Sequence, residues 1–299
     1  MKKLLQDRVA IVTGAGAGLG RAHALELARH GARVLVNDVA GAHAGSPASA
    51  VADEIVRNGG SALAAAGDVT DYAAMQALVG RAMDEWQRVD ILVNNAGILR
   101  DKSFSKMTLD DFRQVLDVHL MGSVHCAKAA WEIMREQRYG RIVMTTSSSG
   151  LYGNFGQANY SAAKMALVGL MQTLALEGAK YDIRVNCLAP TAATAMTEGL
   201  LLPDALERLA PASVSPALAA LVAEDAPTRC ILLAGAGGVE SANITMTRGI
   251  FVEPGADAAQ HIHARMDEIR DRAGELVPGT GFEQCQFELA KAGFDMPLP

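Results

Sequence analysis

One segment near the start of the chain constrains the fold more than any other. Residues 8–13 form a short apolar run rich in β-branched side chains, typical of a buried parallel strand. Gly14, Gly18 and Gly20 follow, and apolar side chains then recur at helical spacing through residue 30. This order of strand, glycine-rich turn and helix suits a phosphate group, because glycines allow close backbone approach and the helix N-terminus supplies free N–H groups. The segment predicts an α/β fold that binds a dinucleotide.

An acidic residue after the second apolar run bears on which dinucleotide binds. Residues 33–38 read as a strand that ends in Asp38, and a carboxylate there can accept hydrogen bonds from the adenosine ribose. The same carboxylate would repel the 2′-phosphate of NADP by about 4 kcal/mol per charge pair at close range and an intermediate dielectric constant. No lysine or arginine lies within residues 14–20 to offset this repulsion. We therefore expect NAD as the cofactor.

Strands and helices are expected to alternate along the rest of the chain, which is the pattern of a parallel sheet with right-handed crossovers. Further strands are expected at residues 61–66, 90–94, 141–146, 183–189 and 230–234, and helices at 48–58, 71–86, 109–137 and 160–180. The predicted fold class is α/β, with a single doubly wound parallel sheet of Rossmann type and helices on both faces. We expect residues 1–252 to form one NAD-binding domain with a built-in substrate site, and 253–299 to be an extension packed on it.

A serine, a tyrosine and a lysine indicate chemistry. Tyr160 and Lys164 are four residues apart, so on a helix they share one face. A nearby ammonium group is expected to lower the pKa of a phenol, and such a tyrosine can exchange a proton with an alcohol or a ketone. Ser147, thirteen positions earlier, could hold the same substrate oxygen. These three residues are the predicted catalytic group.

Composition excludes several other classes. The net charge is −6, from 27 basic and 33 acidic residues, and no basic cluster indicates a nucleic-acid partner. The four cysteines show no C-x-x-C pairing and no H-E-x-x-H is present, so we expect neither disulfides nor a metal. No apolar run is long enough for a signal peptide or a membrane span. We expect a cytoplasmic protein without a membrane partner.

These motifs together resemble the short-chain dehydrogenase/reductase family over residues 4–251. The resemblance implies that Asp68 and Val69 hold the adenine ring, that Asn95 lies beside the nicotinamide ribose, and that Lys164 hydrogen-bonds that ribose. It implies a cofactor site made of Gly14, Gly18, Leu19, Gly20, Asp38, Asp68, Val69, Asn95, Ala96, Gly97, Tyr160, Lys164, Pro190 and Thr194.

A narrower resemblance concerns residues 95–104, 139–144 and 149–160. These segments are similar to the dehydrogenase domain of the peroxisomal multifunctional enzyme of β-oxidation, which acts on (3R)-3-hydroxyacyl-CoA. Two positions depart from the wider family pattern: His119 stands where many members carry an asparagine of a proton relay, and Thr191 where a glycine often follows the proline. Histidine at the first position is shared with the β-oxidation subfamily.

The resemblance implies an NAD-dependent oxidoreductase that interconverts a secondary alcohol and a ketone, namely (3R)-3-hydroxyacyl-CoA and 3-oxoacyl-CoA. A hydroxysteroid or another free secondary alcohol is the alternative substrate, and a non-catalytic NAD(H)-binding sensor is the alternative of another class. Family likeness also implies a homodimer or homotetramer. Substrate recognition is expected within residues 191–213, where Met196 and residues 200–202 either line an acyl or sterol channel or cap the core.

Overall fold

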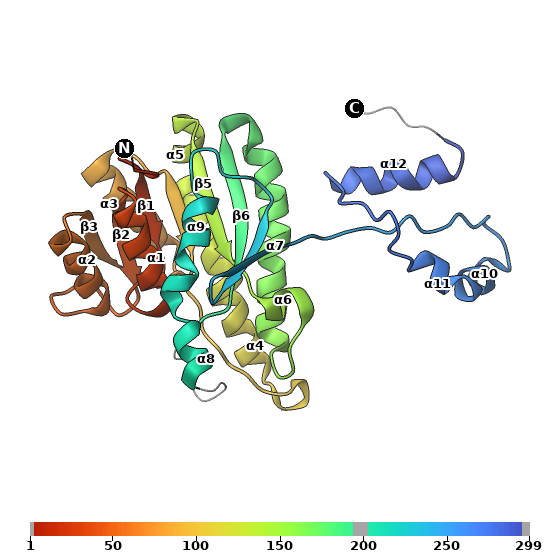
Figure 1. The fold of residues 1–299 in the computed structure, drawn as a ribbon, viewed down its shortest axis with the longest axis horizontal. Coiled ribbons are helices and arrows are strands. Elements are labelled where there is room, and N and C mark those ends of the chain that lie inside the picture. The colour runs from red at the N-terminus through yellow and green to blue at the C-terminus, as the bar shows by residue number, and fades with distance from the viewer. Residues whose placement is uncertain (1–2, 194–202, 295–299) are drawn as a thin grey trace. The chain divides into compact units, whose positions relative to one another are not determined.

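An eight-stranded sheet organises the protein, whose computed structural model describes residues 3–193 and 203–294 (Figure 1). The strand order is β3-β2-β1-β4-β5-β6-β7-β8. The strands are β1 (Val9–Val12), β2 (Arg33–Asp38), β3 (Ser61–Ala66), β4 (Ile91–Asn94), β5 (Gly140–Thr145), β6 (Ile183–Pro190), β7 (Ile231–Gly235) and β8 (Gly238–Ala242).

Strands β1 to β7 pair in parallel. The chain runs outward from β1 to β3 and then returns to place β4 on the other side of β1, so the order reverses between β1 and β4. In open α/β sheets such a reversal leaves a crevice at the carboxyl ends of the strands, where ligands bind. The predicted doubly wound α/β fold is confirmed.

One strand was not predicted. β8 follows β7 after Ala236 and Gly237, which have φ angles of 51° and 86°. Two successive residues with positive φ form the turn that joins antiparallel hairpins. The first four residues of β8 are exposed, so no apolar alternation marked this strand in the sequence.

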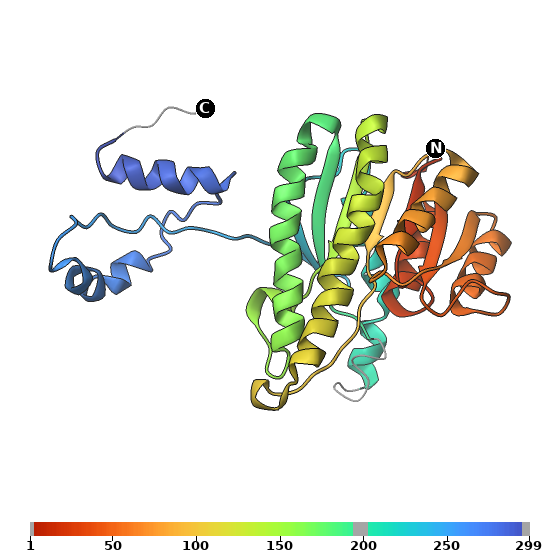
Figure 2. The same cartoon turned by 180° about the vertical axis from the view of Figure 1, so that it is seen from behind.

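Helices cover both faces of the sheet (Figures 1 and 2). Helices α1 (Gly18–Arg29), α2 (Pro47–Arg57) and α9 (Ser215–Leu221) pack together on one face, and α3 (Tyr72–Trp86), α5 (Gly122–Gln137) and α7 (Ala158–Gly178) lie on the other. The remaining helices are α4 (Leu109–Leu116), α6 (Ser148–Tyr152), α8 (Pro203–Arg208), α10 (Ala258–Ala264), α11 (Met266–Ile269) and α12 (Gly281–Lys291), with 3₁₀ turns at Phe104–Lys106, Ala179–Tyr181 and Pro211–Ser213.

The long helix expected at residues 109–137 is interrupted. A π-helical turn, Asp117–Met121, separates α4 from α5, and the backbone N–H of Gly122 bonds to the carbonyl of Asp117, five residues back. Such a turn inserts an extra residue into a helix and is often found at functional sites. Periodicity in the sequence did not reveal it.

Contacts within the chain divide it into two compact units, Met1–Ser241 and Ala242–Pro299. The first contains β1 to β7 and most of β8, with every predicted site residue. The second contains α10, α11 and α12 and a bridge between Met246 and Leu276. The predicted domain boundary at residue 252, and the packing of 253–299 on the first domain, stay predictions.

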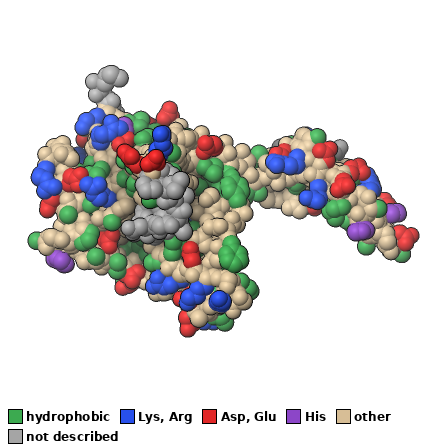
Figure 3. All heavy atoms as spheres, turned by 60° about the horizontal axis from the view of Figure 1, so that its bottom comes forward, with side chains coloured by type: hydrophobic (Ala, Val, Ile, Leu, Met, Phe, Trp, Pro, Cys, Tyr) green, Lys and Arg blue, Asp and Glu red, His purple; other side chains and the backbone are tan. Residues whose placement is uncertain are grey.

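Charges of both signs are interspersed on the molecular face shown in Figure 3, with no single basic patch on that face. Over the described ranges 3–193 and 203–294, no helix is long and apolar enough to span a lipid bilayer. The same residues contain no group of three or more histidine, cysteine, aspartate or glutamate side chains placed to hold a metal ion.

Candidate active site

The glycine-rich turn between β1 and α1 is held tightly against the loop that follows β4. The side-chain amide of Asn95 donates to the carbonyls of Thr13 and Gly14, at 2.9 and 3.1 Å. A Cβ atom on Gly20 would lie 2.2 Å from the carbonyl oxygen of Gly14 and 2.6 Å from Nδ2 of Asn95, so no larger residue fits there. Gly14 and Gly18 have φ angles of 60° and 52°, which favour glycine.

The N-terminus of α1 begins within this turn. Ala17, which precedes the helix, provides no side-chain cap, and no acidic residue lies in the first turn. The first N–H groups of the helix have no partner within the helix and carry partial positive charge. This donor set and the close-packed glycines fit the pyrophosphate of a dinucleotide.

Asp38 lies at the end of β2, directly beside the turn. Its two carboxylate oxygens accept hydrogen bonds from the backbone N–H groups of Gly16 and Ala40, at 3.0 and 3.1 Å. A Cβ on Gly16 would lie 2.8 Å from one of these oxygens. Each oxygen keeps lone-pair capacity for a further donor, such as a ribose hydroxyl.

The other predicted cofactor residues follow the carboxyl ends of neighbouring strands. Asp68 and Val69 follow β3; Asp68 accepts from the N–H and hydroxyl of Thr70, at 2.9 and 2.8 Å, and Val69 is buried. Residues 95–97 follow β4, and Pro190 ends β6. Carboxyl ends of parallel strands share one edge of the sheet, so the fold brings all these residues to one side. Thr194, Met196 and residues 200–202 lie outside the described residues.

The loop after β4 is also fastened to β1. The hydroxyl of Thr13 accepts from the backbone N–H groups of Asn95 and Ala96, both at 3.1 Å. Gly97 lies against His119, where a Cβ would approach the ring to 2.2 Å. The loop is therefore a rigid wall of the crevice.

The predicted catalytic residues come together at the same edge. Ser147 follows β5 and caps α6, while Tyr160 and Lys164 lie one turn apart near the start of α7. The Ser147 hydroxyl lies close enough to the Tyr160 phenol to lower its pKa. Nζ of Lys164 lies 5.4 Å from the centre of the Tyr160 ring and donates to the carbonyl of Thr145 at 2.5 Å. The geometry places a phenol, a hydroxyl and an amine around one small volume.

The expectation that Lys164 lowers the pKa of Tyr160 below its ordinary value is wrong. The pKa of Tyr160 is raised above its ordinary value, because burial disfavours the phenolate more than the hydrogen bond from Ser147 favours it, and Asp101 raises the pKa further. Burial also lowers the pKa of Lys164 to about 7. Spacing alone predicted the meeting of the two side chains but not that Lys164 is buried and Tyr160 partly buried.

Several contacts around the group were not predicted. The side chain of Gln157 donates to Asp101 at 2.6 Å, and that of Asn159 donates to the carbonyl of Arg100 at 3.1 Å, which fastens the start of α7 to the loop after β4. Lys102, on the same loop, pairs with Asp111 at 3.0 Å. The run of polar residues before Tyr160 was the only sequence signal for this network.

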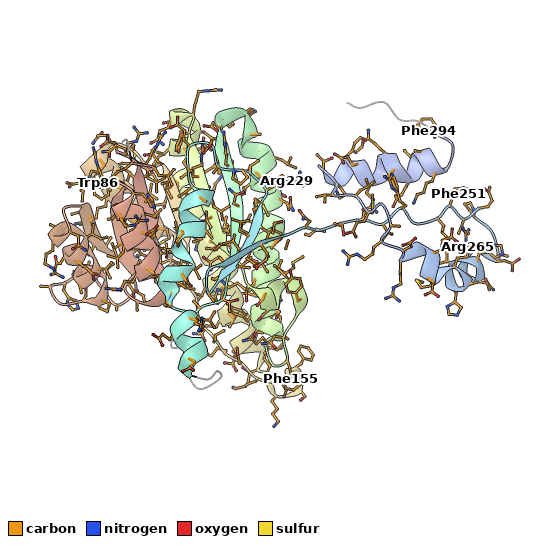
Figure 4. All side chains as sticks on the ribbon, in the orientation of Figure 1. Trp86, Phe155, Arg229, Phe251, Arg265 and Phe294 are labelled. Carbon is orange, nitrogen blue, oxygen red and sulfur yellow. The ribbon has the colours of Figure 1, made fainter. Side chains whose placement is uncertain are left out.

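A second unpredicted contact is between rings. The imidazole of His119 meets the Tyr160 ring edge to face, with centroids 5.2 Å apart and planes at 86°. On the other side of the group, the loop between α6 and α7 carries Phe155, which is 90% exposed and projects outward in Figure 4.

Comparison with known proteins identifies the class. The family model for short chain dehydrogenases matches residues 8–202, and the protein belongs to the short-chain dehydrogenase/reductase family. It is an oxidoreductase of the kind that uses NAD or NADP, and the predicted family is confirmed.

Particular relatives are close over most of the chain. A short-chain type dehydrogenase/reductase of Mycobacterium tuberculosis, Rv0148, is 48% identical over 92% of this chain and 98% of its own length. The peroxisomal multifunctional enzyme type 2 of Drosophila melanogaster is 47% identical over 85% of this chain, which spans only 43% of that enzyme.

Solved structures agree with this assignment. The full-length Drosophila enzyme superposes with a TM-score of 0.81 and 36% identity, covering 97% of this chain and 50% of that one. A 7α-hydroxysteroid dehydrogenase complexed with NADH and a bile acid has a TM-score of 0.71 and 31% identity, covering 78% of this chain and 95% of that one.

Proposed function

We propose that this protein is an NAD(H)-dependent dehydrogenase that interconverts (3R)-3-hydroxyacyl-CoA and 3-oxoacyl-CoA. The observation that carries the chemistry is the group of Ser147, Tyr160 and Lys164, with Ser147 and Lys164 buried, beside a dinucleotide-binding turn. A phenol in hydrogen-bond contact with a serine hydroxyl can hold one alcohol oxygen and move its proton.

The proposed roles follow from the geometry. The Ser147 hydroxyl donates a hydrogen bond to the substrate oxygen, and Oη of Tyr160, as phenolate, takes the hydroxyl proton. A nicotinamide held beside this group would supply the hydride acceptor for the carbinol carbon and a positive charge. Because burial raises the pKa of Tyr160, phenolate forms readily only when positive charge is close. Lys164, whose Nζ lies 5.4 Å from the ring centre, supplies part of that charge in its protonated form.

Asp38 supports NAD rather than NADP. Its carboxylate is fixed beside the turn by the N–H groups of Gly16 and Ala40. A 2′-phosphate there would face this charge, which is unfavourable by about 4 kcal/mol at an intermediate dielectric constant.

Two observations support the substrates. Identity of 45–50% to three peroxisomal multifunctional enzymes, and of 51% to a peroxisomal hydratase-dehydrogenase-epimerase, favours the acyl-CoA. The likeness to a hydroxysteroid dehydrogenase that holds NADH favours a hydroxysteroid as the second candidate. A homodimer or homotetramer is part of the proposal, and light scattering on the purified protein tests it.

The test follows NADH absorbance with NAD⁺ or NADP⁺. The substrates are (3R)- and (3S)-3-hydroxybutyryl-CoA, a longer (3R)-3-hydroxyacyl-CoA, a 7α-hydroxysteroid and 2-butanol. Turnover of the (3R)-acyl-CoA with NAD⁺, and not of the (3S) form, is expected. Activity confined to the steroid or to 2-butanol would leave the chemistry intact and refute the CoA assignment. Tight NADH binding with no turnover of any substrate would refute the proposed catalysis.

A further inference from the structure

His119 lies at the one irregular turn of its helix. It is the central residue of the π turn Asp117–Met121, and it is only 2% exposed. Its own carbonyl accepts a hydrogen bond from the Ser123 hydroxyl at 2.7 Å, which satisfies a backbone group at the widened turn. The turn therefore presents this side chain inward at a defined position.

The loop after β4, which belongs to the predicted cofactor site, holds the ring of His119. Nε2 lies 2.8 Å from the carbonyl oxygen of Ile98 and 3.1 Å from its backbone nitrogen. Because a neutral ring nitrogen either carries a proton or presents a lone pair, it makes one of these hydrogen bonds at a time. Gly97 leaves the room that the ring fills, since a Cβ there would lie 2.2 Å from Cε1. The ring and the loop after β4 fit each other closely.

The opposite side of the contact is the tyrosine itself. The His119 and Tyr160 rings are nearly perpendicular, at 86°, with centroids 5.2 Å apart. Edge-to-face packing at this separation is attractive and restricts the rotation of both rings. Tyr160, packed against this ring and with the Ser147 hydroxyl near its phenol, has little freedom to turn.

The charge state of His119 matters for its role. Burial, together with the charge of Lys164, lowers the pKa of His119 to about 3, so the imidazole is neutral near pH 7. The charged or titratable groups around the Tyr160 ring are Lys164 on the same helix and Asp101 on the loop after β4. A neutral ring that contributes packing rather than charge is therefore what faces the phenol.

We propose that His119 is a positioning residue whose ring fixes the orientation of the Tyr160 phenol and ties it to the loop after β4. This inference rests on the proposed catalytic role of Tyr160. The ring contact, rather than the hydrogen bond to Ile98, is the operative part, because it alone touches the side chain that moves the proton.

Two substitutions separate the two contacts. His119→Phe keeps a ring against Tyr160 and loses the hydrogen bond to Ile98. His119→Asn can serve both backbone groups of Ile98 and loses the ring. His23→Asn is the matched control, because His23 is also fully buried, has a pKa lowered to about 4, and bonds to Ser215 on the α1 side of the sheet.

We expect His119→Asn to lower kcat roughly ten- to a hundredfold, since small misplacements of a reacting group have effects of this size. NADH affinity should change less than about threefold, because asparagine can still hydrogen-bond to Ile98 and hold the loop after β4. His119→Phe should keep kcat within about fivefold of the wild type, and His23→Asn should leave kcat unchanged. (3R)-3-hydroxybutyryl-CoA is the substrate, or the best substrate of the panel above.

A second readout needs no turnover. The ultraviolet absorbance of tyrosinate, with Tyr160→Phe subtracted, gives the ionisation midpoint of Tyr160. We expect His119→Asn to shift that midpoint downward by about half a pH unit or more, because a smaller side chain admits water to a buried phenol. His23→Asn should not shift it.

The outcomes are distinguishable. Wild-type kcat and an unshifted midpoint in His119→Asn would overturn the inference while the proposed function stood. A wild-type kcat in His119→Asn together with a low kcat in His119→Phe would also overturn the inference, because the hydrogen bond to Ile98 would then be the contact that matters. If His119→Phe does not fold, His119→Asn decides alone. The proposed function would be refuted by a different result, a Tyr160→Phe variant that is as active as the wild type.

Discussion

In the unit Met1–Ser241 every residue of β1, β4 and β5 is buried, whereas in Ala242–Pro299 no described residue is buried. The second unit nevertheless carries large apolar side chains, among them Phe251, Phe282 and Phe294, which are about half exposed. The first unit buries the apolar surface on which folding depends, and it also holds the reactive groups.

The difference teaches where substitutions should matter. In the first unit the backbone, the glycines and the buried charged groups pack closely against one another. Adding or removing a single atom there is therefore expected to change stability or binding strongly. In the second unit a Cβ added at Gly255, Gly281 or Gly293 meets nothing within 4 Å. Each of the next three predictions pairs a residue of the first unit with one of the second.

The largest effect on stability is expected at a glycine. In Gly20→Ala the new methyl would lie 2.2 Å from a backbone oxygen, so the helix or the turn must shift. We expect a loss of about 1–3 kcal/mol in unfolding free energy and loss of NADH binding. Gly281→Ala, at the start of α12, meets nothing within 4 Å and should be neutral or stabilising by roughly 0.5–1 kcal/mol. Thermal unfolding measures the stability of the two variants, and NADH fluorescence measures their cofactor binding. Equal stability and equal binding in Gly20→Ala and Gly281→Ala would contradict the difference between the two units.

A buried charge gives the next effect. Burial lowers the pKa of Lys164 from 10.5 to about 7, so a charged lysine opposes folding. Below pH 7 both folded and unfolded chains carry the proton and the full cost is present. Between pH 7 and about 10.5 the folded chain releases the proton first, and the cost declines. Lys164→Met should therefore be inactive yet more stable, by about 2 kcal/mol or more below pH 7.

The control for this prediction is Lys291→Met in the second unit, at a lysine that is not buried. Urea denaturation at several pH values checks both variants. A gain in Lys164→Met that stayed constant from pH 6 to pH 10 would count against the assigned burial cost.

The smallest of the three effects concerns cofactor choice. Asp38→Ser removes the carboxylate beside the turn but leaves a hydroxyl that can accept the N–H of Gly16. We expect the preference for NAD over NADP to fall roughly ten- to a hundredfold, because the repulsion of the 2′-phosphate is removed. Asp257→Ser in the second unit should not change the preference for NAD over NADP. Comparison of kcat/KM with the two cofactors decides, and an unchanged ratio in Asp38→Ser would show that another group selects the cofactor.

Much of the fold could be predicted from the sequence because local patterns determine it. Strands buried on both faces read as continuous apolar runs, and the turn at Gly14 to Gly20 is marked by its residues. The meeting of Ser147, Tyr160 and Lys164 followed from helical spacing and from the shared edge of parallel strands.

What could not be predicted depends on burial and on non-local contacts. β8 is largely exposed, so it has no periodic signal. The π turn at His119 and its ring contact with Tyr160 bring together residues 41 positions apart. The upward shift in the pKa of Tyr160 arises because the surrounding chain excludes water, and no residue spacing reports that.

The measurement that tests the central claim most directly is NAD⁺-dependent alcohol oxidation by Tyr160→Phe and by Tyr152→Phe. Tyr152, eight positions earlier and 69% exposed, loses the same hydroxyl without touching the reactive group. We expect Tyr160→Phe to lower kcat about a hundred- to ten-thousandfold while NADH still binds, and Tyr152→Phe to match the wild type. Equal rates for Tyr160→Phe and the wild type would contradict the account.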